Sequence, residues 1–221
     1  MPASANSSHF NARSSATSAL DRVTSLLIAT TNQGKLREIE GILEGVAVRL
    51  LTLNERPTIV EPDEIGTTFE ENARLKARYY SKATGLVSVA DDSGIEIDAL
   101  DKAPGVHSAR WHGTDYPKKF RKIQELLRER GLTTSTARFV CSVAVADGDR
   151  IVFEARGTVE GAIAFEPRGT NGFGYDPIFF YPPFGCTLAE LDRKRKAEVS
   201  HRGKAFRQLR EYLMTQSNDR S

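Results

Sequence analysis

The stretch Val87-Ser88-Val89-Ala90-Asp91-Asp92-Ser93-Gly94 is a short apolar run that ends on two carboxylates, a hydroxyl and a glycine. Its alternating β-branched residues predict a buried strand, and the polar residues after them predict a turn at the edge of a sheet, within reach of solvent and ligands. Asp, Ser and Gly are also the ordinary residues of turns. The stretch alone therefore leaves a structural and a catalytic interpretation open.

A strand, a tight polar loop and a helix are predicted before this stretch. Ser25 to Thr31 has the pattern of a buried strand, and apolar residues recur at helical spacing from Lys35 to Leu43. The loop from Asn32 to Lys35 would present backbone N–H groups at the positive end of the helix dipole, which suits a phosphate group. It lacks the glycine and the Ser/Thr of a Walker loop, so a capped helix with a solvated Lys35 is the alternative.

Further strands are predicted on both sides of the opening stretch. Val46 to Leu51 and Thr58 to Glu61 are strand-like, and Ile95 to Leu100 alternates like an exposed strand after the Asp91-Asp92 turn. Thr136 to Ala146 and Arg150 to Glu160 form a predicted β-hairpin, which could build a second lobe.

A long helix is predicted from Phe69 onward. Thr68 and Glu71 have the spacing of a capping box. Glu64 precedes this helix, where a carboxylate can face a metal ion or simply favour the helix N-terminus. Lys76 falls on a different stripe from the apolar residues, and its role is equally open.

The segment from Arg168 to Pro177 has three glycines around two aromatic residues and an acid. Glycine permits positive φ and close approach of the backbone, so this loop can present Phe173 as a stacking surface with Asp176 at its rim. A glycine-rich bulge whose aromatic rings pack into the core is the alternative. The position of the rings between glycines, without a strand period, favours ligand contact.

A basic run, Arg193 to Lys196, precedes a helix that opens with Ser200-His201-Arg202-Gly203. Most such runs are solvated surface. Arg202 is a fixed multiple donor and His201 a tunable one, and together they suit a carbonyl-bearing base or a phosphate.

Composition excludes several classes of protein. The 221 residues carry 31 basic and 29 acidic side chains, a formal net charge of +2, which gives no electrostatic case for a nucleic-acid or membrane-surface protein. Cys141 and Cys186 form neither a disulfide framework nor a CxxC site, so a reducing, cytoplasmic location is predicted. Residues 1–24 are rich in Ser and Ala and predict a disordered extension, with import into an organelle as the alternative. Residues 25–221 are predicted to form a single domain.

Six successive segments resemble the signatures of the inosine/xanthosine triphosphate pyrophosphatases, from Leu26 to Leu213. This resemblance implies an elongated α/β fold with two lobes, a long mixed β-sheet flanked by helices, an active-site cleft between the lobes, and a homodimer. The matching segments are Thr30 to Lys35, Glu64 with Gly66 to Ala73 and Lys76, Ala90 to Gly94, Pro104 to Arg110, Gly172 to Pro177, and Ser200 to Gly203.

The resemblance implies Mg²⁺-dependent hydrolysis of ITP, dITP and XTP to the monophosphate and pyrophosphate. Asp92 would be the general base, Glu64 would carry the metal, and Asp92 could also serve the metal, so the division of these roles is open. Asp91 would support its neighbour, and Ser93 would touch the phosphate chain. The implied substrate-binding residues are Thr30, Thr31, Asn32, Gln33, Gly34, Lys35, Lys76, Ser93 and Lys196 for the phosphates, and Phe173, Gly174, Tyr175, Asp176, His201 and Arg202 for the base.

A 6-keto purine offers a hydrogen-bond acceptor where adenine offers a donor, so His201 and Arg202 can favour hypoxanthine or xanthine over adenine. Guanine shares the 6-keto group, and the sequence does not indicate how its 2-amino group is rejected. Two departures from the family pattern are His107 and Trp111, at positions where tyrosine or another aromatic is expected. A third is the stretch Arg193 to Arg195, which is more often acidic. Two other functions are a pyrophosphatase for modified pyrimidine triphosphates and a catalytically silent nucleotide-binding protein.

Overall fold

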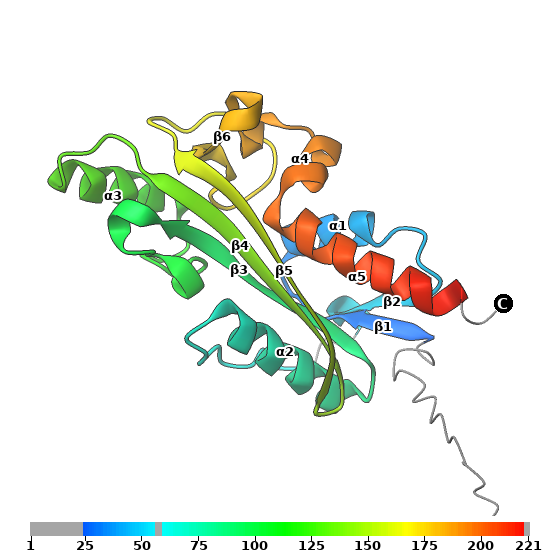
Figure 1. Cartoon of the computed structure of the whole chain (residues 1–221). Coiled ribbons are helices and arrows are strands. Elements are labelled where there is room, and N and C mark those ends of the chain that lie inside the picture. Colours follow the sequence, from blue (N-terminus) through cyan, green and yellow to red (C-terminus); the bar gives the residue numbers. More distant parts are fainter. Residues whose placement is uncertain (1–23, 56–58, 219–221) are drawn as a thin grey trace, which may run out of the picture.

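The computed structural model describes residues 24–55 and 59–218. Its elements form a seven-stranded sheet in the order β2-β1-β3-β4-β5-β6-β7, flanked by helices (Figure 1). The prediction for residues 1–24 lies outside the described residues except for Thr24. The strands are β1 (Ser25–Ile28), β2 (Arg49–Thr52), β3 (Ser88–Ile97), β4 (Thr136–Asp147), β5 (Arg150–Ile163), β6 (Phe179–Tyr181) and β7 (Cys186–Thr187), and the helices are α1 (Gln33–Ile42), α2 (Phe69–Thr84), α3 (Tyr116–Glu129), α4 (Arg193–Val199) and α5 (His201–Asn218).

The sheet is mixed, as expected. β1 runs parallel to both β2 and β3, whereas β3 to β7 pair in antiparallel fashion. β1 pairs with β3 only through Leu27 and Ile28, opposite Ser88 and Val89. β3 is far longer than β1 and continues past its carboxyl end, where, among the described residues, β4 is the one strand of the sheet still paired with it. Ligands of open α/β sheets bind beyond such strand ends, and the structure has its charged cleft there.

The opening stretch does not end in a turn, so that prediction is wrong. β3 continues through Asp91, Asp92 and Gly94 to Ile97, paired with β4 along its whole length. The polar residues remain in the strand because helices on both faces supply cations to their carboxylates, a compensation that buried charges need. The predicted separate, exposed strand after Asp92 is the second half of β3, and its Ile95 and Ile97 are fully buried.

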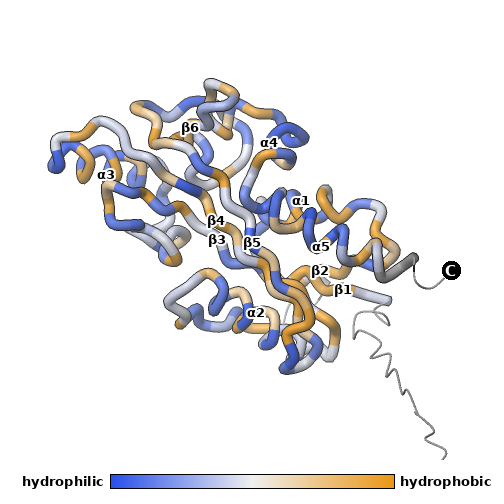
Figure 2. The backbone as a smooth tube through the Cα atoms, in the orientation of Figure 1, coloured by the Kyte–Doolittle hydropathy of each residue, from blue (hydrophilic) through white to orange (hydrophobic). Residues whose placement is uncertain are grey.

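Helices cover both faces of the sheet. α2 packs on β3 and β4 from one face, and α5 packs on β4 and β5 from the other, with α1 beside α5 (Figure 1). The tube in Figure 2 is most hydrophobic where the strands pass between these helices. A first apolar cluster packs β1, β3 and β4 against α1 and α5, and a second packs β3, β4 and β5 against α3. The first and second lobes are the parts of the fold built on these two clusters. The β4–β5 hairpin is confirmed, but it does not form the second lobe alone, because Val143 belongs to the first cluster and Phe139 to the second.

The predicted starts of α2 and α5 agree with the structure, whereas α1 begins at Gln33, two residues before the predicted Lys35. Asn32 caps α1, and Thr68 and Glu71 form the expected capping box at α2. α5 opens at His201. Residues 59–61 lie in no strand, contrary to prediction, and Thr58 is outside the described residues. None of the helices in the described part of the chain is long and apolar enough to cross a membrane.

Candidate active site

A charged cleft lies along β3 beyond the end of β1, between the two lobes. Its walls come from α1, β3, the 105–109 segment, the 172–176 loop and the start of α5. Most of the site residues predicted from the sequence line it: Asn32, Lys35, Glu64, Asp92, Ser93, Phe173, Gly174, Tyr175, Asp176, Lys196, His201 and Arg202. Five predicted residues are not among those that line it: Thr30, Thr31, Gln33, Gly34 and Lys76.

The two adjacent carboxylates of β3 point to opposite faces of the sheet, because side chains alternate along a strand. Asp92 faces α2, where Asn72 Nδ2 donates to its Oδ2 at 3.1 Å and Lys76 Nζ to its Oδ1 at 3.1 Å. Lys76 Nζ also donates to Glu64 Oε1 at 2.6 Å. Lys76 thus lies just behind the cleft, between its two carboxylates.

The charges of this trio shift one another's pKa values. Burial would lower the pKa of Lys76, but Asp92, Asp91 and Glu64 together raise it above its usual value. Burial would raise the pKa of Glu64, but Lys76 lowers it on balance. Burial raises the pKa of Asp92 and Glu64 adds to that effect, while Lys76 opposes it. The surroundings therefore raise the pKa of Asp92 and lower that of Glu64.

Asp91 faces α1 and α5, where it meets Lys35 Nζ at 3.1 Å and Arg202 Nη2 at 3.1 Å. Burial alone would raise the pKa of Asp91, but Lys35 and Arg202 hold it far below its usual range. The Asn32 side chain accepts from the backbone N–H groups of Gly34 and Lys35, so α1 is capped. Lys35 is nevertheless not simply solvated, because its ammonium is paired with Asp91 at the cleft.

The two aromatic residues of the 172–176 loop have different surroundings. The Phe173 ring lies half-buried at the cleft, against Gly34, with Lys196 Nζ 4.8 Å and Arg202 Cζ 5.6 Å from its centroid. Tyr175 packs into the core of the second lobe and donates its hydroxyl to Ser108 O at 2.9 Å.

Asp176 is buried and does not lie at the rim, contrary to prediction. It accepts from the backbone N–H of Phe173 at 2.8 Å and from Lys196 Nζ at 2.5 Å. Burial raises the pKa of Asp176, although Lys196 opposes the shift. The carboxylate therefore fixes the loop from within.

His201 and Arg202 form the end of the cleft next to Phe173. The His201 ring stacks on Phe139 with centroids 4.6 Å apart. Burial, Arg202 and Lys196 lower its pKa well below 6.5, so the imidazole is neutral. Arg202 donates to Glu38, Asp91 and Ser93 at 2.8, 3.1 and 2.7 Å. Two buried nitrogens here, His201 Nδ1 and Arg202 Nε, have no hydrogen-bond partner among the residues that the structure describes.

No role was assigned from the sequence to three residues that hold this site together, although Asn72 and Arg110 lie within the matching segments. Glu38 accepts from Lys196 at 2.6 Å and from Arg202 at 2.8 Å. Asn72 holds Asp92, and Arg110 Nη1 donates to Glu64 Oε2 at 2.8 Å. Helical spacing could have indicated the first two, because Glu38 lies three residues after Lys35 and Asn72 four before Lys76.

Only the last residue of the basic run from Arg193 to Lys196 belongs to the cleft. Arg193, Lys194 and Arg195 are exposed, whereas Lys196 is buried against Glu38 and Asp176. The backbone N–H of Ser200 donates to Lys196 O at 2.9 Å and closes the last turn of α4.

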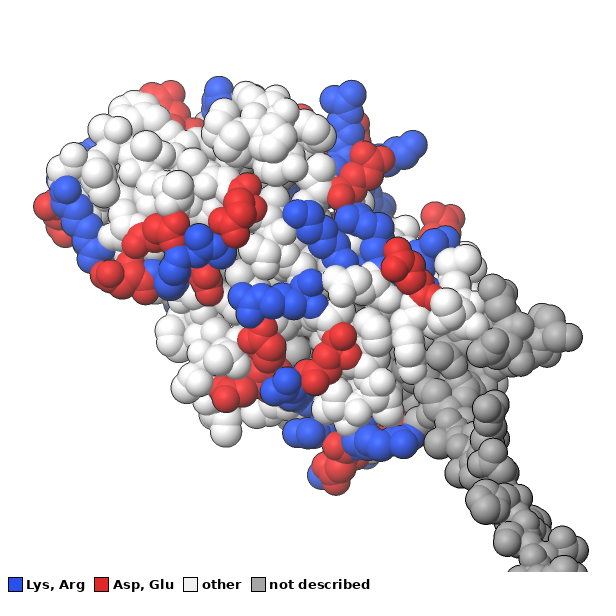
Figure 3. Space-filling view, in the orientation of Figure 1, with Lys and Arg blue, Asp and Glu red and all other residues white. Residues whose placement is uncertain are grey.

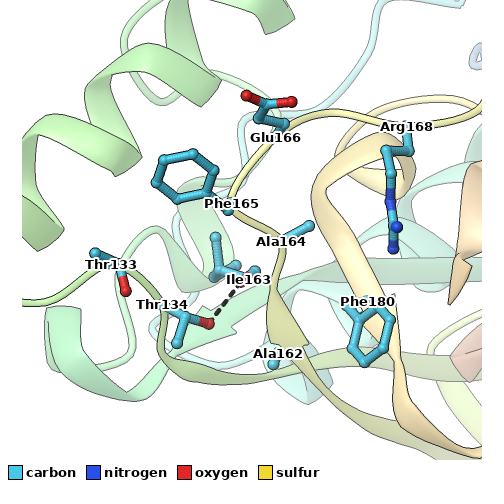
Figure 4. Close-up of a pocket in the computed structure, with 9 residues that line it drawn as sticks. All are labelled: Thr133, Thr134, Ala162, Ile163, Ala164, Phe165, Glu166, Arg168 and Phe180. Atoms are coloured by element: carbon cyan, nitrogen blue, oxygen red, sulfur yellow. Dashed lines mark hydrogen bonds between the residues drawn. The ribbon is translucent and has the colours of Figure 1, made fainter. Parts of the chain in front are cut away.

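A second hollow of about 460 Å³ lies on the outer side of the second lobe (Figure 4). Thr133, Phe165, Glu166, Arg168 and Phe180 are among its lining residues. It contains one acid and one base, whereas the cleft brings several buried acids and bases together. Perturbed titratable groups gather at functional sites, so the cleft is the candidate active site.

The fold and this site define an α/β protein with a charge-lined cleft suited to a phosphorylated ligand. The chain belongs to the Ham1 family, whose sequence model matches residues 26–212. This confirms the resemblance identified in the sequence.

Individual relatives match most of the chain. It is 48% identical over 184 residues to a protein of Exiguobacterium sp. named dITP/XTP pyrophosphatase, covering 83% of this chain and 94% of that one. A Listeria monocytogenes protein of the same name is 45% identical and covers 86% and 94%. The solved structure of a HAM1 protein from Coxiella burnetii superimposes with a TM-score of 0.80 at 39% identity, covering 87% of this chain and all of that one.

Proposed function

We propose that this chain hydrolyses the non-standard purine nucleoside triphosphates ITP, dITP and XTP to the monophosphate and pyrophosphate. Membership of the Ham1 family and relatives named dITP/XTP pyrophosphatase support this activity. The observation that carries it is one cleft with a paired-carboxylate end, Glu64 and Asp92, and an aromatic and cationic end at Phe173 and Arg202.

The aromatic end binds the purine. Phe173 stacks on the base, and the unpartnered nitrogens of His201 and Arg202 offer polar contacts to its edge. A neutral imidazole has one donor and one acceptor nitrogen, while Arg202 only donates. The 6-keto oxygen of hypoxanthine or xanthine satisfies such a donor, whereas the 6-amino group of adenine leaves it unpaired in a buried site.

The phosphates extend from the base toward α1 and β3. Lys35 is the cation nearest the start of α1, and Ser93 lies between it and Arg202. Thr30 and Thr31 precede the Asn32 cap, and Gln33 and Gly34 open α1, so we assign them to this end through their backbone. Lys196 contacts Phe173 and Asp176, so we assign it to the base end, where it fixes the ring.

Mg²⁺ fits the carboxylate end. The described residues contain no group of three or more His, Cys, Asp or Glu that could hold a metal alone. Mg²⁺ commonly uses only one or two protein carboxylates together with substrate phosphates and water, and Glu64 and Asp92 provide two. When bound, the ion would neutralise charge on the phosphates.

Asp92 acts as the general base. Its carboxylate lies in the cleft, and Asn72 and Lys76 fix both oxygens, so it can accept a proton from a water positioned for attack on the α phosphorus. Glu64, held by Lys76 and Arg110, serves the metal. Asp91 remains ionised and anchors Lys35 and Arg202.

The test replaces Asp92 by Asn, which is nearly isosteric and cannot take up the proton. We expect ITP turnover to fall by at least about 100-fold, while ITP still binds and the fold is unchanged. Asp115→Asn, at the exposed cap of α3, is the control and should keep turnover. Near-normal turnover by Asp92→Asn would remove it from the role of base.

The resemblance further supports a cytoplasmic homodimer that acts on free nucleotides, without a nucleic-acid or membrane partner. Acidic and basic side chains are interspersed over the face in Figure 3, in keeping with the near-neutral net charge. Sedimentation at micromolar concentration distinguishes a dimer from a monomer.

A further inference from the structure

Lys119 is a buried cation outside the residues assigned so far. It lies on α3, and its side chain is fully buried, whereas Lys118 on the same helix is largely exposed. Its Nζ donates to Ser108 O at 3.1 Å and to Ala109 O at 2.7 Å. The ammonium also lies 4.4 Å from the ring centroid of Tyr116.

Lys119 differs from the other buried basic residues of the described chain. Lys76, Lys196 and Arg202 each meet at least two carboxylates. Within residues 24–55 and 59–218, no ion pair joins Lys119 to any carboxylate within 4.0 Å. Burying an unpaired ammonium is costly, and a methionine of similar length would fill the same space without that cost. Space-filling alone therefore does not account for this lysine.

The carbonyl of Ser108 connects Lys119 to both walls of the cleft. It accepts from Lys119 Nζ and also from the hydroxyl of Tyr175. Tyr175 belongs to the loop that presents Phe173. On the other side, the 108–110 segment leads to Arg110, which holds Glu64 at 2.8 Å.

The same segment is tied to β3. Ser108 Oγ accepts from the backbone N–H of Ile95 at 2.9 Å and donates to Gly105 O at 2.6 Å. Gly94 leaves room for this contact, because a Cβ there would lie 2.4 Å from Ser108 Oγ. Lys119 therefore closes a chain of hydrogen bonds from the base loop through the 108–110 segment to the carboxylate end.

We propose that Lys119 is a positioning residue that fixes the distance between the base-stacking loop and the carboxylate end of the cleft, and thereby sets the discrimination between purine bases. This inference rests on the proposed function. A shift of the base loop changes which edge of the base meets His201 and Arg202 while the phosphates stay at Lys35. Displacements of about 1 Å can cost 100-fold in rate, so the correct base loses more than a poorly bound one.

The test measures kcat and KM for ITP and for GTP with Mg²⁺ in the wild type, Lys119→Met and the matched control Lys118→Met. We expect Lys119→Met to lower the ratio of kcat/KM for ITP over GTP about tenfold, mainly through KM for ITP, and Lys118→Met to change it less than about twofold. A purely structural role lowers the amount of folded enzyme, which cancels in this ratio.

Tyr175→Phe provides a second measurement, because it removes one hydroxyl from the same carbonyl and leaves the ring. We expect it to lower the ratio in the same direction, by about threefold, and the double variant to lose less than the product of the two effects. If Lys119→Met does not fold, an unchanged ratio in Tyr175→Phe overturns the proposal.

The outcomes separate the two claims. A wild type that prefers ITP, with unchanged ratios in Lys119→Met and Tyr175→Phe, refutes the role of Lys119 and leaves the proposed function standing. A wild type with no preference for ITP refutes the proposed function and, with it, the inference that depends on it.

Discussion

Replacing Arg202 by Met tests whether the buried ion-pair network carries stability as well as recognition. The guanidinium is almost fully buried and donates to Glu38, Asp91 and Ser93. Met fills similar space but leaves the buried Asp91 and the partly buried Glu38 each short of one partner. Removing one member of a buried ion pair costs about 3 to 5 kcal/mol.

The lower end of that range applies here, because each carboxylate keeps one cation. Glu38 retains Lys196 at 2.6 Å, and Asp91 retains Lys35 at 3.1 Å. We therefore expect Arg202→Met to lower the free energy of unfolding by about 3 kcal/mol. For a chain of this size that corresponds to a fall in Tm of roughly 6 to 12 °C.

Arg207→Met is the matched control on the same helix. Its guanidinium donates to the backbone carbonyls of Ala197 and Glu198 at 2.6 and 2.8 Å, and to no carboxylate among the described residues. Its loss should cost only about 1 kcal/mol. Urea and thermal denaturation without nucleotide measure both variants. If Arg202→Met is no more destabilising than Arg207→Met, the network does not contribute as the structure indicates.

The remaining predictions concern the base pocket. A Cβ at Gly34 would lie 2.7 Å from Phe173 Cδ1, so Gly34→Ala should displace the ring and raise KM for ITP about tenfold. Gly41→Ala on the same helix meets only the end of the exposed Arg193 side chain and should leave KM unchanged; equal KM values would contradict the stacking role. Because the pKa of buried His201 is depressed, the unfolded chain gains a proton below about pH 6.5 that the folded chain does not. The Tm of the wild type should therefore fall more steeply than that of His201→Gln as the pH drops through this range. If the Tm values of the two proteins change in parallel with pH, the imidazole of His201 is not buried in its neutral form.

Short sequence patterns predicted a helix start and a hairpin, because neighbouring residues determine such elements. The capping box of Thr68 and Glu71 placed the start of α2, and alternation placed the β4–β5 hairpin. The end of β3 was predicted too early, at Asp91, because it depends on residues that are distant in the sequence. Asp91 and Asp92 look like turn residues until Lys35, Arg202 and Lys76 are brought against them by helices distant in the sequence.

The same limit applies to the candidate site. The family resemblance placed Phe173, His201 and Arg202 at one site, and they line one cleft, but it could not show that Asp176 is buried against Lys196. Glu38 was given no role because its partners lie about 160 residues away in the chain, and its helical spacing from Lys35 alone does not identify them. Pairing of buried charges is a property of the packed structure, and a single sequence does not reveal it.

The most direct test of the central claim is a substrate panel for the purified wild-type chain with Mg²⁺. Pyrophosphate release from ITP, dITP, XTP, GTP and ATP is measured at matched concentrations, and kcat/KM is compared. The site predicts that kcat/KM for ITP, dITP and XTP exceeds that for ATP by at least about 10- to 100-fold, since a buried mismatch costs about 1 to 3 kcal/mol. The family resemblance extends this expectation to GTP. Equal release of pyrophosphate from all five nucleotides, or release of orthophosphate alone, would contradict the account.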